Sequence, residues 1–182
     1  MTVALVLIDL QNDYFPGGAM ELVESTAAVG EAATLLQAAR ARGRPVFHVQ
    51  HLSTRAGATF FLPESRGARI HEAVTPRADE EVVVKHYPNA FRETVLLERL
   101  RAGGITSLAL AGMMTHMCVD TTVRAAADLG FECHLAHDAC ATRALSFAGR
   151  TVAAPDVQAA YLAALGGAFA RLQTAHELAA TL

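Results

Sequence analysis

Lysine is almost absent from this sequence. Of its 15 basic residues, 14 are arginine, and Lys85 is the only lysine. Because arginine and lysine differ in shape, hydration and pKa behaviour, we interpret the exception as a local requirement for an ammonium group. A solvated residue at a strand end is the alternative. Clusters of basic residues are absent too, and the formal net charge is −3, which argues against a nucleic-acid partner.

Long apolar runs and paired cysteines are also missing. No apolar run approaches the roughly 18 residues of a membrane span, so no membrane partner is expected. The start, MTVALVLIDL, lacks the basic region and cleavage site of a signal peptide. Cys118, Cys133 and Cys140 are an odd number without zinc-type spacing, which disfavours a disulfide framework. We therefore expect a cytoplasmic protein with reduced thiols.

Hydrophobic residues, mostly small ones, are abundant. They make up 52% of the 182 residues, and alanine supplies most of the excess. This length suits a single domain, 1–182, with one sizeable core. An alanine-rich surface suits helices that pack on a sheet and on other subunits, so we expect a homo-oligomer.

Apolar runs alternate with helical patterns along the whole chain. We expect strands at 3–8, 45–51, 81–84, 107–111, 131–136 and 171–175, and helices at 24–42, 92–102, 118–129 and 155–168. This alternation predicts an α/β, three-layer sandwich with a central, mostly parallel six-stranded sheet flanked by helices. No G-x-G-x-x-G follows the first strand, so a dinucleotide cofactor is not expected. The irregular segment 52–79 has the length of a lid or binding loop.

Three chemically capable residues end, or closely follow, predicted strands: Asp9, Lys85 and Cys118. The carboxyl ends of parallel strands share one edge of the sheet, where open α/β folds build their sites. If these strands are neighbours, a carboxylate, an ammonium and a thiol meet there. A helix start lowers the pKa of a nearby thiol, although Cys118 as a small buried apolar residue is an equal alternative on position alone.

Such a group of side chains is suited to splitting an unactivated amide. The ammonium favours the thiolate, the carboxylate takes and returns a proton, and the sulfur attacks the carbonyl carbon. Backbone N–H groups in the turn before Cys118 would stabilise the oxyanion.

Three motifs in this order resemble the isochorismatase-like cysteine hydrolases: ALVLIDLQNDYF, VVVKHYPNAF and LALAGMMTHMCVDTTVRAAADLGF. The resemblance covers residues 3–174. It implies a Rossmann-like fold, Asp9 as general acid/base, Lys85 as the thiolate-stabilising cation and Cys118 as nucleophile. It also implies a cis peptide between Met113 and Met114, an oxyanion hole made by the N–H groups of Met114 and Cys118, and a dimer or tetramer.

Two differences from particular members of the family limit which of its reactions we expect. Nicotinamidases of this family carry an Asp-x-His pair after the second strand as part of a metal site, whereas this chain has Val49-Gln50-His51. We therefore expect no metal, with His51 as a pocket-wall or hydrogen-bonding residue. Members that cleave isochorismate lack the nucleophilic cysteine, so the presence of Cys118 disfavours that reaction.

Seven further residues are candidates for the substrate pocket. Gln11 orients Asp9 and Lys85 or else satisfies loop backbone, and His116 faces substrate or else solvent. The aromatic candidates are as often plain core residues. The full set is Gln11, Phe15, His51, Phe61, Tyr87, Phe91 and His116.

The sequence thus predicts a hydrolase without metal or cofactor that cleaves a C–N bond (amide, carbamoyl or lactam) of a small-molecule substrate through a thioester on Cys118. A redox-responsive protein is the first alternative, because an activated thiol serves that role as well. Reversible pairing of Cys118 with Cys133 would support it. A non-catalytic family member, with Cys118 inert to alkylation, is the second alternative.

Overall fold

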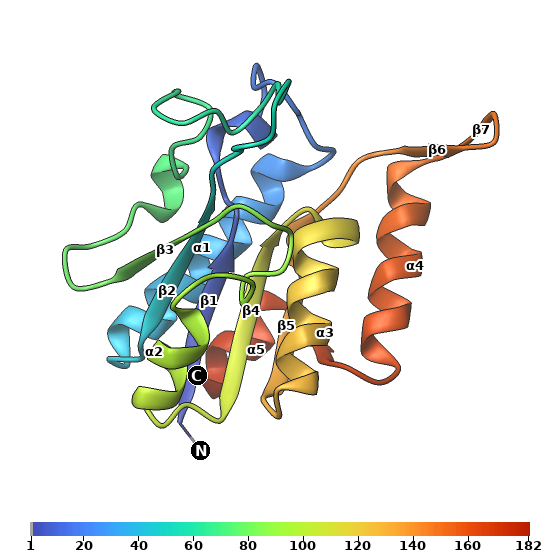
Figure 1. Cartoon of the computed structure of the whole chain (residues 1–182). Helices are drawn as coiled ribbons and strands as arrows, with labels where there is room; N and C mark the ends of the chain where they lie inside the picture. The colour runs from blue at the N-terminus through green and yellow to red at the C-terminus, as the bar shows by residue number, and fades with distance from the viewer. Residues whose placement is uncertain (1) are drawn as a thin grey trace.

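A six-stranded parallel sheet forms the centre of the computed structural model, which describes residues 2–182 (Figure 1). Its strand order is β3-β2-β1-β4-β5-β8, and every neighbouring pair is parallel. The strands are β1 (Val3–Ile8), β2 (Val46–His51), β3 (Glu81–Lys85), β4 (Ser107–Met113), β5 (Glu132–Ala141) and β8 (Arg171–Gln173). Continuous apolar runs such as VALVLI form these strands because both faces of the sheet are covered. The predicted fold class is confirmed.

Helices cover both faces of the sheet. On one face lie α1 (Ser25–Ala41) and α5 (Ala175–Thr181), and on the other lie α2 (Leu96–Ala102), α3 (Asp120–Asp128) and α4 (Ala154–Gly166). Alternate side chains of β1 pack on opposite faces of the sheet. Leu5 and Leu7 pack toward α1, and Val6 and Ile8 pack toward α2 and α3. Within residues 2–182, no helix is long and apolar enough to span a bilayer.

Several boundaries differ from those expected. Helix α2 begins at Leu96 rather than at 92, because Glu93 has a positive φ of 57° that interrupts a right-handed helix. Strand β5 runs to Ala141 rather than to 136, since a register irregularity lets it continue alongside the end of β4. Helix α5 was not expected, although Thr174 and Glu177 form a capping box at its start.

A two-stranded hairpin, β6 (Leu145–Phe147) and β7 (Arg150–Val152), was not expected either. Its turn residues, Ala148 and Gly149, have φ angles of 49° and 74°. Two consecutive positive φ angles characterise the type I′ turn that matches the twist of a tight hairpin. Figure 1 shows the hairpin extending away from the sandwich, beside the start of α4.

The irregular segment 52–79 is tied to the loop that follows β1. The Asp13 carboxylate accepts the Phe61 N–H at 2.6 Å, and the side-chain amides of Gln11 and Gln50 both donate to the Ala68 carbonyl, at 2.7 and 2.8 Å. These bonds satisfy backbone groups that a buried loop would otherwise leave unpaired. The segment is thereby held against the carboxyl edge of the sheet.

Glu80 anchors the far end of this segment. Its carboxylate contacts Arg40 Nε at 2.7 Å and His48 Nε2 at 3.0 Å, and it accepts the Arg77 N–H at 2.9 Å. Only 7% of the side chain is exposed. The Arg40 guanidinium outweighs the effect of burial and, with the other two groups, lowers the pKa of Glu80 to about 2.

Glu80→Gln is expected to lower the free energy of unfolding at pH 7 by up to about 3 kcal/mol, since each pKa unit is worth ~1.4 kcal/mol. A lowered pKa stabilises the fold above the ordinary value of 4.5, and this contribution is lost as the pH falls toward 2. Urea unfolding at pH 7 and pH 3 measures it. The control is Glu81→Gln, which breaks an exposed pair with Arg99 and should cost about 1 kcal/mol or less. Equal losses in both variants would contradict the assignment.

Candidate active site

The three predicted site residues come from three strands that are not all neighbours. Asp9 follows β1, Lys85 ends β3 and Cys118 lies shortly after β4. Strand β2 lies between β3 and β1, which separates the two outer strands by about 10 Å. Lysine has the length to cross this gap. Its side chain reaches past His51, the residue beside it in register on β2.

The side chains of these residues nevertheless meet around one atom, Lys85 Nζ. This nitrogen lies 2.8 Å from Asp9 Oδ2, 3.3 Å from Cys118 Sγ and 2.9 Å from His51 Nδ1. It also donates to the Tyr87 carbonyl at 3.1 Å. Asp9, Lys85 and Cys118 are at most 4% exposed. A buried carboxylate, ammonium and thiol are thus in direct contact.

Lys85 is held in its charged form. Burial opposes the charge, but the Asp9 carboxylate and the Cys118 sulfur outweigh it and raise the pKa of Lys85. For His51 the balance is opposite: burial and the neighbouring ammonium lower its pKa to about 4. Neutral His51 therefore accepts a hydrogen bond from Lys85 through Nδ1.

The surroundings of Cys118 act on the pKa of its thiol in opposite directions. Burial and the adjacent Asp9 carboxylate raise the pKa of the Cys118 thiol, and Lys85 lowers it only in part. The raised pKa favours a protonated thiol at rest, and Lys85 Nζ contacts both this sulfur and Asp9 Oδ2. This arrangement favours attack coupled to proton transfer to Asp9 over a standing thiolate.

The redox alternative is not supported by the positions of the cysteines. Cys133 lies opposite Leu108 at the start of β4, whereas Cys118 follows Met113 at its end. Five residues of strand separate these levels by about 16 Å, and a disulfide needs Cα atoms within roughly 7 Å. Burial and the raised pKa of Cys118 also slow its reaction with peroxide.

The turn between β4 and α3 carries the predicted oxyanion-hole groups. The Met113–Met114 peptide is cis, as the resemblance implies. A π-helical turn (Thr115–Val119) follows and leads into α3. The first N–H groups of a helical segment lack intrahelical acceptors, and Met114 and Cys118 lie at or within this turn.

Gly112 allows β4 to approach β1 closely before this turn. Its φ is 142°, and a Cβ there would lie 2.1 Å from the Ile8 carbonyl oxygen. Any larger residue would push apart the strand ends that carry Asp9 and Cys118.

Three predicted pocket residues lie at or near the triad. His51 contacts Lys85 through its ring, and Tyr87 through its backbone carbonyl. The Phe61 ring is 5.8 Å from that of His51, between ring centroids. The Arg92 guanidinium lies over the Tyr87 ring, 3.6 Å from its centroid.

Four predicted pocket residues make other contacts. Gln11 bonds only backbone groups, those of His51 and Ala68, which resolves its two alternatives in favour of loop support. Phe91 stacks on Phe131 among core residues. Phe15 packs on His71, at 4.1 Å between centroids, and His116 is described below.

His116 is buried rather than solvent-exposed. Its Nδ1 bonds the Thr142 hydroxyl, and its ring meets the edge of Tyr161 at 6.1 Å. Burial and the nearby Arg143 lower the pKa of His116, so the ring is neutral at physiological pH. It joins the turn before Cys118 to the end of β5.

Sequence reasoning missed Tyr14. Its ring is 1% exposed and packs edge-on against Phe61 at 4.6 Å. Burial, followed by the charges of Cys118 and Asp9, raises the pKa of Tyr14. Its position inside the LQNDYF motif was the available signal.

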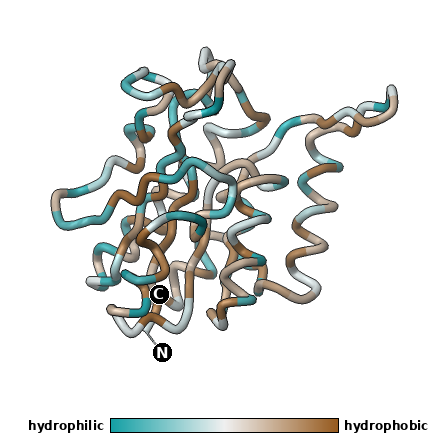
Figure 2. Tube along the Cα trace, in the orientation of Figure 1, coloured by the Kyte–Doolittle hydropathy of each residue, from teal (hydrophilic) through white to brown (hydrophobic). Residues whose placement is uncertain are grey.

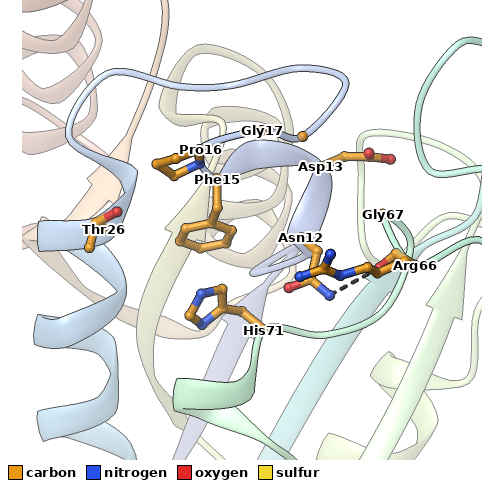
Figure 3. Close-up of a pocket in the computed structure, with 10 residues that line it drawn as sticks. Asn12, Asp13, Phe15, Pro16, Gly17, Thr26, Arg66, Gly67 and His71 are labelled. Atoms are coloured by element: carbon orange, nitrogen blue, oxygen red, sulfur yellow. Dashed lines mark hydrogen bonds between the residues drawn. The ribbon is translucent and has the colours of Figure 1, made fainter.

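A cleft of about 410 Å³ lies among the loop after β1, the start of α1 and the segment 52–79 (Figure 3). Phe15 and His71 line it, together with Asn12 and Arg66, whose backbone carbonyl accepts the Asn12 amide at 3.0 Å. Asp9, Lys85 and Cys118 do not line this cleft. Phe15 therefore lines this cleft, whose walls do not include the triad residues.

The only group suited by distance to hold a metal within residues 2–182 is Asp9, His51 and Cys118, whose ligand atoms lie within 4.8 Å of one another. Lys85 Nζ contacts all three residues. An ammonium ion therefore already supplies the positive charge at their centre. These residues do not fit a metal ion while Lys85 is in place. The aspartate that nicotinamidases of this family carry two residues before the histidine is Val49 here, and its side chain is buried.

The fold and the site define an α/β protein that gathers a thiol, a carboxylate and an ammonium at the carboxyl edge of a parallel sheet. A family model described as the Isochorismatase domain matches residues 3–177. The chain belongs to the isochorismatase family, whose members are hydrolases and include amidase-type relatives.

Relatives along nearly the whole chain support this membership. The family protein YddQ of Bacillus subtilis is 47% identical over 174 residues, which cover 96% of this chain and 97% of YddQ. A crystal structure of an isochorismatase hydrolase from Oleispira antarctica has a TM-score of 0.94 and 49% identity, covering 98% and 96%. Streptothricin hydrolase of Streptomyces noursei is 35% identical over 154 residues, covering 85% of this chain and 52% of that protein.

Proposed function

We propose that this protein is a cysteine amidohydrolase that cleaves a C–N bond of a small molecule without metal or cofactor. The observation that carries the proposal is the contact of Lys85 Nζ with both Asp9 Oδ2 and Cys118 Sγ in a buried site. The carboxylate and the thiol lie within 4.8 Å of each other, so the nucleophile has a candidate base beside it. The relationship to streptothricin hydrolase supports the same reaction class.

Acylation begins at the Cys118 thiol. Its proton moves to Asp9 as the sulfur attacks the substrate carbonyl carbon, and Lys85 stabilises the negative charge of the sulfur during transfer. The N–H groups of Met114 and Cys118 donate to the oxyanion. Asp9 then gives its proton to the leaving nitrogen, the C–N bond breaks, and a thioester remains on Cys118.

Deacylation uses the same carboxylate in reverse. Asp9 takes a proton from water as the water oxygen attacks the thioester carbonyl. The C–S bond breaks, the acid product leaves, and the proton on Asp9 returns to the Cys118 sulfur. Lys85 remains protonated throughout, because Asp9 and Cys118 raise its pKa.

The proposal includes the compartment of the protein and the walls of its substrate pocket. Three free, buried cysteines suit the reducing cytoplasm. A small-molecule substrate suits a buried triad. His51 and Phe61, with Tyr14, are the side chains proposed to bound the substrate on the β2 side.

Ammonia release from primary carboxamides, carbamoyl compounds and ureas tests the proposal, with lactam opening followed by mass spectrometry. At least one compound should be hydrolysed, and acid quenching should trap the acyl mass on the peptide that contains Cys118. Addition of EDTA should leave the rate unchanged. If no compound reacts and iodoacetamide fails to label Cys118, the protein is the non-catalytic binding module instead.

A further inference from the structure

The β6–β7 hairpin, residues 145–152 and hereafter the arm, packs against little of its own chain. Phe147 is 87% exposed and Val152 is 45% exposed. The arm extends from the sandwich in Figure 1, and its two strands pair only with each other. An isolated two-stranded hairpin is marginally stable in water. An arm that displays an aromatic side chain in this way needs a second surface.

A groove of about 640 Å³ lies at the root of the arm. The start of α1, the end of β5 and one side of α4 form it, and the α4 trace is mostly apolar or neutral in Figure 2. Its apolar walls are mostly alanines, which leave room for an aromatic ring: Val23, Ala27, Ala28, Ala154, Ala159 and Leu162. In Figure 1 the arm extends outward past the start of α4.

The arm and the groove carry opposite charges. Glu24, Glu31 and Asp138 line the groove, with no lysine or arginine among the lining residues. The arm has one charged residue, Arg150, and Arg143 lies shortly before it. Glu31 Oε2 is shielded from solvent and has no hydrogen-bond donor within residues 2–182, and the His176 ring nitrogen lies 3.8 Å away.

We propose that two copies of this chain exchange arms, so that the arm of each lies in the groove of the other. A two-fold axis makes such an interface self-complementary. Phe147 enters the groove of the second copy between its alanines, and Arg150 pairs with Glu31 of the second copy. This proposal does not depend on the proposed function.

The exchange places the second copy beside the active site. The groove floor includes Cys140, Ala141 and Thr142. Cys140 pairs in register with Gly112, and Thr142 bonds His116, two residues before Cys118. The arm of the second copy therefore covers the strand end that supports the turn before the nucleophile.

Sedimentation velocity at micromolar concentration tests the exchange. The parent protein should be at least a dimer, and Phe147→Ser should weaken the association by about 30-fold or more, since buried aromatic anchors dominate interfaces. Val95→Ser, which changes a residue with 45% exposure before α2, is the matched control and should leave the association unchanged. Circular dichroism confirms that each variant is folded.

Charge reversal separates exchange between copies from contact within one copy. The Arg150→Glu variant and the Glu31→Arg variant should each be monomeric. In either homodimer, both contacts between residue 150 of one copy and residue 31 of the other would bring like charges together. An equimolar mixture of the two variants should associate again, since each heterodimer contact pairs opposite charges. A monomeric parent, an unaffected Phe147→Ser variant or a mixture that stays monomeric would overturn the proposal.

Discussion

Replacing Cys118 with alanine is expected to abolish turnover while the fold stays intact. The sulfur is the atom that bonds the substrate, and removal of the nucleophile from a catalytic group of this kind lowers kcat by roughly 10⁴-fold or more. Alanine is smaller than cysteine and apolar, so the buried site should lose only about 1 kcal/mol of stability. Ammonia release on the substrate found by the panel measures the first effect, and thermal unfolding measures the second.

Cys133→Ala is the matched control for this experiment. Cys133 is also buried and unpaired, but it lies at the opposite end of the sheet from the triad. It should show a similar small loss of stability and an almost unchanged rate. If the Cys118 variant keeps more than a few per cent of the parent rate, the nucleophile is another group.

Replacing Lys85 with methionine is expected to remove both activity and a large part of the stability. Methionine matches the length of the lysine stem but leaves the fully buried Asp9 carboxylate without its cation. Breaking a buried pair from one side costs about 3–5 kcal/mol. Arg99→Met breaks an exposed pair with Glu81 and should cost about 1 kcal/mol or less. Urea unfolding at pH 7 compares the two losses.

The pH dependence of the parent protein follows from the same pair. The pKa of Lys85 is raised above its ordinary value of 10.5. The stability that the pair contributes is therefore fully present below that pH, and it is lost as the pH rises through the higher folded-state pKa. The Lys85→Met variant should lack this alkaline loss.

A double variant distinguishes the structural role of Lys85 from its chemical role. Asp9→Asn with Lys85→Met removes both charges, and asparagine tolerates the positive φ of 51° at this position. Stability should recover relative to Lys85→Met alone, because no uncompensated buried charge remains, but activity should not. Recovery of neither would indicate that Lys85 acts mainly through packing.

Much of this site could be predicted from the sequence because its residues are marked locally. Asp9, Lys85 and Cys118 each interrupt or follow an apolar run, and the three motifs around them resemble one family. The cis peptide at Met113 was implied by that resemblance and is present. Phe91 and Gln11 were harder to place, because an aromatic or an amide in a loop carries no local sign of whether it faces a pocket, a core or a backbone group.

The sequence by itself determined where β1 stops and that β3 brings Lys85 to its end, since the length of an apolar run sets where a buried strand stops; β4 and β5 run further than expected. It also determined the parallel α/β class through the alternation of strand and helix patterns. Tertiary structure alone decided that β2 lies between β3 and β1, so that Lys85 reaches Asp9 past His51. Packing also raises the pKa of the Cys118 thiol, first through burial, and leaves the arm standing away from the sandwich. Strand order, burial and charge proximity arise from contacts between distant segments, which local sequence patterns do not encode.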